Sequence, residues 1–213
     1  MTKLYPLYLR LNGEKCLVVG GGKVAARKVN SLLEAEATVT VVSPILIPPL
    51  AELEKKGQIE HIQRTYQEKD LEGAFLVICA TDDKEVNRRV AAQCQQKKIL
   101  VNVVNDPPQS NFFVPAVIRQ GSLSIAVSTD GKSPLLAARI REQLEQTYGP
   151  EYADFLELLG EVRQDIIENV PDPETRREIL QRIVQSDIIS LIKENRYQEI
   201  KERVQNAYRS SGS

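Results

Sequence analysis

Three consecutive glycines follow a short apolar run in the stretch "CLVVGGGKVAARK", residues 16–28. With Ala25 they form the pattern G-x-G-x-x-A, which is typical of the turn that holds a pyrophosphate between a strand and a helix. Gly20 allows a tight turn, Gly22 lets the backbone approach the phosphates, and Ala25 lets the helix pack close to the sheet. The helix N-terminus then offers free N–H groups to the anion. The predicted phosphate-binding residues are Gly20, Gly22, Lys23 and Val24; the alternative is a glycine turn that only packs well.

A second candidate site element follows the next apolar run, "ATVTVVS" at 37–43. Dinucleotide-binding domains commonly place Asp or Glu here to hold the ribose hydroxyls of NAD, or a basic residue near the 2′-phosphate of NADP. This chain has Ser43 instead, and no Lys or Arg occurs between Lys28 and Lys55. NAD is therefore favoured over NADP as the cofactor. Ser43 is expected at the ribose, and Pro44 and Ile45 either flank the adenine or only begin the next helix.

Two further strand ends carry polar residues. Thr81 and Asp82 in "CATDD" (79–83) are candidates for the ribose or the nicotinamide, because ligands of such sheets lie beyond the carboxyl ends of the strands. The alternative is that Asp82 or Asp83 caps the next helix. Asn102, in "NVVND" (102–106), is expected to face the same crevice.

Strand-like and helix-like segments alternate through the first hundred residues. We predict strands at 15–20, 37–43, 59–63, 74–81 and 99–104, with helices at 23–35, 50–57 and 83–98. Such alternation indicates a parallel sheet covered on both faces. Right-handed crossovers then favour an α/β fold of the doubly wound, Rossmann-like type.

The pattern changes after the loop at 105–111. Segments 112–118 and 122–128 have the spacing of a β-hairpin, and Ser133 with Pro134 marks the start of a helix over 134–147. Everything after Pro150 is predicted to be helical, at 151–169, 173–185, 187–194 and 196–208. The hairpin is apolar on both faces, so it would leave an exposed edge strand unless a second copy pairs with it in a homodimer.

Composition excludes several classes of function. The 213 residues carry 28 basic and 29 acidic side chains, so no nucleic acid partner is indicated. No segment resembles a signal peptide or a membrane span, which predicts a cytoplasmic protein without a membrane partner. Cys16, Cys79 and Cys94 are too few for a disulfide framework, and His61 is the only histidine, so no metal site is predicted.

Taken together, the motifs resemble one known family. "VVGGGKVAARKV", "ATDD", "VNVVNDP", "FFVPAVI" and "AVSTDGKSPLLAARIRE" occur in the order and spacing of the precorrin-2 dehydrogenases, the NAD-binding module of siroheme synthases. The resemblance covers roughly residues 1–147. It implies that precorrin-2, a tetrapyrrole, gives a hydride to NAD and loses protons to form sirohydrochlorin in siroheme biosynthesis. Some members also insert ferrous iron, and the sequence leaves open whether this chain does so.

The resemblance also implies a three-part layout. Residues 1–111 would form the NAD-binding domain, 112–149 a dimerisation and substrate-binding region, and 150–213 a helical domain. Two alternatives stay open: a regulatory module that senses NAD(H) through its helical tail, and an interaction protein that keeps the cofactor for structure only. Neither alternative gives the segment "STDGKSP" a role.

A polycarboxylate substrate needs basic and hydroxyl donors. Such side chains gather in and after the "TDGKSP" loop, and Arg119 and Arg141 belong to the same group. Any one of them could be an ordinary surface residue, so the hypothesis concerns the group as a whole. The predicted substrate-binding residues are Ser128, Thr129, Lys132, Ser133 and Arg139.

The acid–base position departs from the family pattern. Family members carry Asp directly after the "NVV" of the fifth strand, where this chain has Asn105 followed by Asp106. Asn cannot accept a proton at neutral pH. Either Asp106 takes over as the base, or Asn105 only orients the substrate and dehydrogenation needs no protein base. Asp106 could also simply cap the turn before Pro107.

Overall fold

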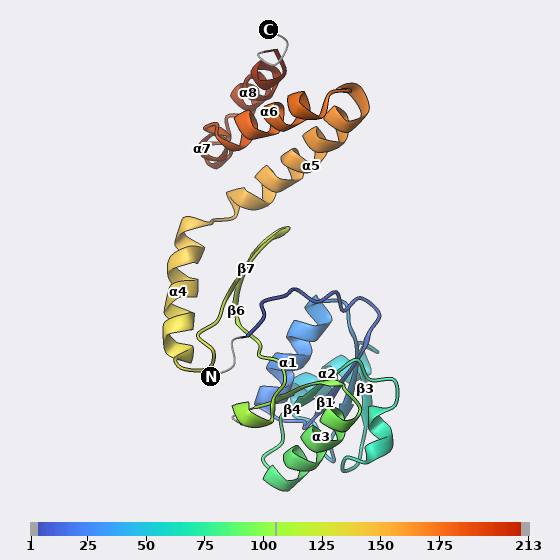
Figure 1. The fold of residues 1–213 in the computed structure, drawn as a ribbon. Coiled ribbons are helices and arrows are strands. Elements are labelled where there is room, and N and C mark those ends of the chain that lie inside the picture. Colours follow the sequence, from blue (N-terminus) through green and yellow to red (C-terminus); the bar gives the residue numbers. More distant parts are fainter. Residues whose placement is uncertain (1–3, 105, 210–213) are drawn as a thin grey trace. The chain divides into compact units, whose positions relative to one another are not determined.

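The computed structural model describes residues 4–104 and 106–209, and the chain forms two compact units, Met1–Val114 and Pro115–Ser213. Asn105, a predicted acid–base residue, lies outside the described residues. We refer to the two parts as unit 1 and unit 2 and describe each by itself. Figure 1 shows their elements in the colours of the sequence.

Unit 1 contains a parallel sheet of five strands with helices on its faces. The strand order is β3-β2-β1-β4-β5, and every neighbouring pair is parallel. This is the doubly wound order that the alternating pattern predicted. The elements are β1 (Lys15–Val19), α1 (Lys23–Glu34), β2 (Thr38–Val42), α2 (Pro48–Lys55), β3 (Glu60–Ile62), η1 (Glu68–Leu71), β4 (Leu76–Cys79), α3 (Lys84–Gln96), β5 (Leu100–Val103) and η2 (Pro107–Gln109).

Two apolar clusters lie on the two faces of this sheet. Because side chains alternate along a strand, β1 sends Val18 into one cluster and Leu17 into the other. Ala25 and Val29 of α1 cover the first face, and Val90 of α3 lies in the cluster on the second. Strands buried on both sides explain why β1 and β4 are continuous apolar runs rather than alternating ones.

Unit 2 joins a hairpin to five helices. Antiparallel β6 (Ala116–Gln120) and β7 (Leu123–Val127) contact α4 and α5, and Phe155, Ile166, Ile183 and Ile188 lie in the helical core. Gly121 turns the hairpin with φ +54°, and a Cβ there would lie 2.8 Å from the Cβ of Ala153. The helices are α4 (Pro134–Thr147), α5 (Glu151–Asn169), α6 (Pro173–Val184), α7 (Ile188–Lys193) and α8 (Tyr197–Arg209).

The hairpin differs from the predicted one at its start. Strand β6 begins at Ala116 rather than at Phe112, because Phe112 packs against the core of unit 1. Asn111 ties the preceding loop to β5 by accepting a hydrogen bond from the Val101 N–H and donating its own N–H to the Val101 carbonyl. The apolar run "FFVPAVI" is therefore divided: its first residues belong to unit 1 and its last residues form β6 of unit 2. The periodicity of the sequence alone does not reveal this division.

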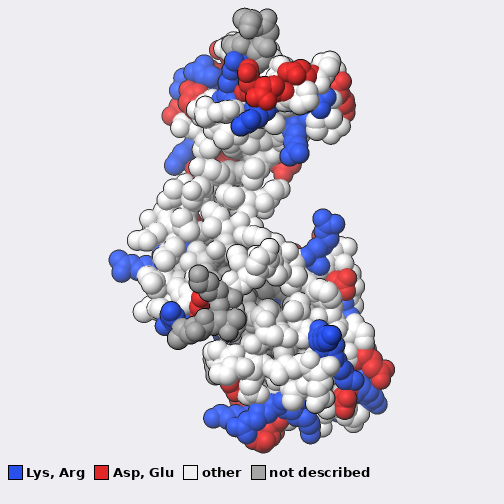
Figure 2. Space-filling model, in the orientation of Figure 1, with Lys and Arg blue, Asp and Glu red and all other residues white. Residues whose placement is uncertain are grey.

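Charged side chains of both signs lie on both units (Figure 2). On the face that Figure 2 shows, basic and acidic residues are interspersed rather than segregated. Within the described residues, none of the helices combines the length and the apolar character needed to cross a membrane.

Candidate functional site

A cavity of about 660 Å³ lies in unit 1 at the carboxyl ends of β1, β2 and β4. The strand order reverses at this point, since β2 and β4 lie on opposite sides of β1. Open α/β sheets bind their ligands at such switch points. The cavity in unit 1 is lined by Val19, Gly20, Gly21, Gly22, Lys23, Val24, Val42, Ser43, Pro44, Ile45, Ile47, Thr65, Tyr66, Ala80, Thr81, Asp82, Asp83 and Val86.

The three glycines have different tasks in this cavity. Gly20 adopts φ +125°, and a Cβ there would lie 2.4 Å from the Ala80 carbonyl oxygen. A Cβ on Gly21 would lie 2.1 Å from the Ile45 carbonyl oxygen. A Cβ on Gly22, in contrast, would meet nothing within 4 Å. Gly20 and Gly21 thus allow close contacts within the protein, whereas Gly22 leaves open space in front of the backbone.

The N-terminus of α1 faces that open space. Gly22 is its N-cap residue, no side chain caps the helix, and its first turn contains no acidic residue. The first N–H groups of a helix have no partner within it and carry a partial positive charge. Lys23 and Val24 line the cavity at this end, while Ala25 is fully buried against the sheet. The arrangement suits an anionic group such as a pyrophosphate.

The loop after β2 forms one side of the cavity and is held in several places. The Ser43 hydroxyl donates to the Ile45 carbonyl oxygen at 2.8 Å, and the Ile47 N–H donates to the Gly21 carbonyl oxygen at 3.0 Å. Behind the loop, His61 Nε2 lies 2.9 Å from the Ser43 carbonyl oxygen. Sequence reasoning missed this role of His61, which arises because β3 lies beside β2 in the sheet.

The turn after β4 forms another side. Asp83 caps α3 by accepting hydrogen bonds from the N–H groups of Glu85 and Val86, so Asp83 is the helix cap and Asp82 is not. Asp82 is exposed and lines the cavity with Thr81. Asn87, buried on α3, donates its amide to the Thr81 carbonyl oxygen at 2.9 Å.

Thr65 and Tyr66 complete the lining and were not predicted. The Arg64 guanidinium meets the buried Asp70 carboxylate at 2.6 and 2.9 Å, which fixes the start of this segment. Burial alone would raise the pKa of Asp70, but hydrogen bonds from Arg64 and the Gln67 N–H hold that pKa below its usual range. The Tyr66 hydroxyl donates to Gln93 at 2.7 Å, and burial raises the Tyr66 pKa.

Two predicted residues near β5 lie apart from this lining. Asn102 donates its amide to the Phe112 carbonyl oxygen at 3.0 Å, which is a contact within the protein. Asp106 precedes η2, and its carboxylate accepts a hydrogen bond from the side chain of Gln109. Neither residue lines the cavity that the glycine turn opens on.

The residues predicted to bind substrate lie in unit 2, with Ser128, Thr129, Lys132 and Ser133 between β7 and α4 and Arg139 on α4. Thr129 accepts the Ser133 N–H on its hydroxyl at 3.1 Å, and Ser133 caps α4 by accepting the Leu136 N–H. Ser128 accepts the Asp130 N–H in the same turn. Lys132 and Arg139 are exposed. Arg141 is instead paired with Glu145 at 2.7 Å and with Glu142 at 3.3 Å, so its charge is partly compensated.

The three cysteines are core residues of unit 1. All are free thiols and buried. Burial raises the pKa of Cys16 to about 11 and those of Cys79 and Cys94 to about 12. Since the thiolate is the reactive form, these side chains are unreactive at neutral pH while they stay buried.

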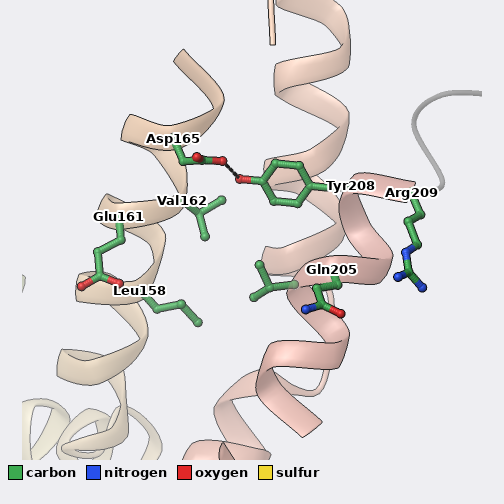
Figure 3. Close-up of a pocket in the computed structure, with 8 residues that line it drawn as sticks. Leu158, Glu161, Val162, Asp165, Gln205, Tyr208 and Arg209 are labelled. Atoms are coloured by element: carbon green, nitrogen blue, oxygen red, sulfur yellow. Dashed lines mark hydrogen bonds between the residues drawn. The ribbon is translucent and has the colours of Figure 1, made fainter. Parts of the chain in front are cut away.

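A second cavity, of about 540 Å³, lies between α5 and α8 in unit 2. Figure 3 shows Leu158 and Val162 on α5 facing Gln205 and Tyr208 on α8, with the Tyr208 hydroxyl donating to Asp165. That hydrogen bond measures 2.6 Å. We call this cavity the α5–α8 groove.

Three family models match the chain in succession. They are described as "Putative NAD(P)-binding" (residues 7–116), "Sirohaem biosynthesis protein central" (120–147) and "Sirohaem synthase dimerisation region" (151–207). The first covers the whole cavity of unit 1, and the second contains the turn with Lys132 and Ser133. The third contains most of the α5–α8 groove.

Individual relatives agree with these matches. Siroheme synthase of Thioalkalivibrio sulfidiphilus is 38% identical over 203 residues, which is 95% of this chain and 42% of that protein. Siroheme synthase of Chromobacterium violaceum is 37% identical over 190 residues, 89% of this chain and 40% of that protein. The chain thus spans about two fifths of these curated relatives.

A solved structure matches over its full length. It is "SirC, precorrin-2 dehydrogenase", which is 33% identical and superimposes with a TM-score of 0.77 over 93% of this chain and 100% of that one. The glycine turn, the switch-point cavity and the order of the three regions agree with this match. The chain belongs to the precorrin-2 dehydrogenase family.

Proposed function

We propose that this protein is an NAD-dependent precorrin-2 dehydrogenase that oxidises precorrin-2 to sirohydrochlorin in siroheme biosynthesis. The observation that carries the proposal is the cavity at the glycine turn, found in a chain that matches a precorrin-2 dehydrogenase over that protein's whole length. The relatives reported above give no support to a module that only senses NAD(H).

The residues of the cavity fit a dinucleotide. The open space at Gly22 and the uncapped start of α1 suit the pyrophosphate, with Lys23 and Val24 beside it. Ser43, Pro44 and Ile45 would hold the adenosine end, and Thr81 and Asp82 the other ribose. When bound, NAD supplies the acceptor for the hydride that leaves precorrin-2.

NAD rather than NADP fits the adenosine end. The Ser43 hydroxyl uses its hydrogen on the Ile45 carbonyl, so its oxygen can accept a hydrogen bond from a ribose hydroxyl. The cavity lining contains one basic residue, Lys23, which lies at the start of α1 and not at the end of β2. A 2′-phosphate would therefore lack a basic partner at that end.

The substrate is a tetrapyrrole with many carboxylates. Lys132 and Arg139 are exposed cations in unit 2, and they would bind those carboxylates together with Ser128, Thr129 and Ser133. Lys132→Ala and Arg139→Ala are expected to raise KM for precorrin-2 without changing the affinity for NAD. An equal change in NAD affinity would contradict the assignment of these residues to the tetrapyrrole.

Asp106 is the candidate base for the proton that leaves with the hydride. Its carboxylate accepts a hydrogen bond from Gln109. We propose a modest role in dehydrogenation and a larger role in any metal insertion, because metal insertion must remove two protons from the tetrapyrrole. Asp106→Ala and Asn105→Asp should be compared in both assays. If Asp106→Ala equals the wild type in both, and Asn105→Asp promotes metal insertion, position 105 is the acid–base site.

We further propose a homodimer. The sheet of β6 and β7 has only two strands, so each strand has one edge without a neighbouring strand in the sheet. The helices that follow the hairpin match the family model of a dimerisation region. Light scattering at micromolar concentration should give twice the mass of one chain. A monomeric mass under those conditions would contradict the proposal.

The activity itself is tested with purified protein, precorrin-2 and NAD. The expected result is formation of NADH together with the absorption spectrum of sirohydrochlorin, and much lower efficiency with NADP. Absence of NADH formation with correctly folded protein would overturn the proposal. Adding ferrous iron to the same mixture measures whether the chain also forms siroheme.

A further inference from the structure

The loop Ser43–Ile45 determines the shape of the cavity near the glycine turn. The Ile45 carbonyl oxygen lies 2.1 Å from the position that a Cβ on Gly21 would take, and the Ser43 hydroxyl oxygen lies 2.7 Å from it. The Gly21 carbonyl in turn accepts the Ile47 N–H. Any displacement of Ser43 therefore changes the position of the backbone beside the predicted pyrophosphate site.

His61 is the side chain that fixes Ser43 from behind. Its Nε2 lies 2.9 Å from the Ser43 carbonyl oxygen, and a carbonyl can only accept, so Nε2 carries the hydrogen. Its Nδ1 lies 3.3 Å from Oε1 of Glu54 on α2, and because a carboxylate only accepts, this contact is a hydrogen bond when Nδ1 also carries a hydrogen. The side chain of His61 is only 7% exposed, so it connects α2 to the loop without lining the cavity.

We propose that His61 is a positioning residue for the dinucleotide: it holds the Ser43–Ile45 loop in the conformation that binds the adenosine end. The proposal rests on the proposed function in naming NAD as the ligand and in assigning the adenosine end to this loop. Without the Nε2 donor, the loop would occupy the binding conformation for a smaller fraction of the time, and the apparent dissociation constant would rise in inverse proportion to that fraction. Because His61 does not touch the ligand, the chemical step should be unaffected.

The test compares His61→Leu, which removes the donor, with His61→Gln, whose amide can still donate to Ser43. NADH binding is measured directly by its fluorescence, and KM for NAD and kcat are measured with precorrin-2. We expect His61→Leu to weaken NADH binding about fivefold, the effect of losing one neutral hydrogen bond. KM for NAD should rise by a similar factor with kcat unchanged, and His61→Gln should restore most of the affinity.

Thr40→Val is the matched control. Thr40 is buried on β2 and donates to Glu60 on β3 at 2.9 Å, so the variant also loses one hydrogen bond between these strands, but outside the cavity. It should lower thermal stability and leave NADH affinity unchanged. Equal NADH affinity in His61→Leu and Thr40→Val, with similar losses of stability, would overturn the proposal and leave His61 a purely structural role.

Glu54→Ala keeps the test decisive if His61→Leu does not fold. The Glu54 side chain is 44% exposed, so the fold should tolerate its removal. The substitution also removes the contact between Glu54 and Nδ1 of the His61 ring. We expect about a twofold loss of NADH affinity; no loss would count against the proposal. Since NADH binding is measured without precorrin-2, a wild type that binds NADH but lacks activity would contradict the proposed function and leave the His61 test intact.

Discussion

The two cavities described above are similar in size but are built differently. The cavity of unit 1 is lined by a glycine turn, strand ends and a helix N-terminus, so its chemistry comes mostly from the backbone. The α5–α8 groove is lined by side chains of two helices, chiefly Leu158, Val162 and Val204 with the ring of Tyr208. A backbone site tolerates few residue types at its turns, whereas a side-chain groove tolerates many substitutions of similar size. Volume therefore does not distinguish a ligand site from a packing groove, but the type of lining does.

The largest expected effect follows from adding one methyl group at Gly21. A Cβ would overlap the Ile45 carbonyl, which is backbone and cannot swing away. We expect Gly21→Ala to destabilise unit 1 by about 3 kcal/mol or more. Soluble yield and thermal unfolding would measure it, and a variant as stable as the wild type would show that the loop moves more easily than the packing indicates.

Gly22→Val should separate binding from folding. The added side chain enters open space at a residue with φ −91°, so the fold is expected to persist. It occupies the space in front of the α1 N-terminus, and NADH affinity should fall on the order of 100-fold, which corresponds to about 3 kcal/mol of steric overlap with the ligand. Unchanged affinity in the folded variant would mean that the glycine turn is only structural.

Asp70→Asn tests the wall of the same cavity. Loss of the pair with Arg64, which is partly exposed, should cost about 2 kcal/mol. The native pKa of Asp70 lies below its unfolded value, so the stabilisation is present above about pH 4 and is lost as pH falls through the native pKa. Unfolding followed from pH 7 to pH 2 should show a larger loss of stability in the wild type than in the variant.

The matched control for that experiment lies in unit 2. Asp172 caps α6 with an exposed carboxylate, and Asn is also a good capping residue. Asp172→Asn should therefore change stability less than Asp70→Asn does. A larger effect of Asp172→Asn would contradict the importance that we give to burial of the Asp70 pair.

The smallest expected effect has the opposite sign. Gly160 is exposed within α5, and a Cβ there would meet nothing within 4 Å. Gly160→Ala should stabilise unit 2 by about 0.5 to 1 kcal/mol, because Ala loses less conformational freedom in a helix. NADH affinity should not change. A loss of stability would contradict the open space that the structure shows at this position.

The same contrast explains what could be predicted from the sequence. The sheet order follows from alternating strands and helices, and the ends of its strands at Gly20, Ser43 and Thr81 meet at one cavity because parallel strands share an edge. The glycine turn is recognisable because a positive φ at Gly20 and the close contact at Gly21 restrict the residue type. Constraints of the backbone are visible in the sequence.

What could not be predicted depends on neighbours distant in sequence. His61 contacts Ser43 only because β3 pairs with β2, and Tyr66 reaches the cavity only because Gln93 and the Arg64–Asp70 pair hold its segment. Asn102 was expected in the crevice, but its amide is used by Phe112, whose place in the core no local pattern reveals. Strand β6 begins late for the same reason.

The positions of the cysteines give the molecule an internal reporter. Cys16, Cys79 and Cys94 all lie in the core of unit 1, and the sequence of unit 2 contains no cysteine. A thiol reagent can modify them only when unit 1 opens, since burial keeps all three protonated and inaccessible. The rate of labelling therefore measures the opening of the dinucleotide-binding unit alone, without any introduced probe. Slower labelling in the presence of NADH would give the free energy by which the ligand closes that unit.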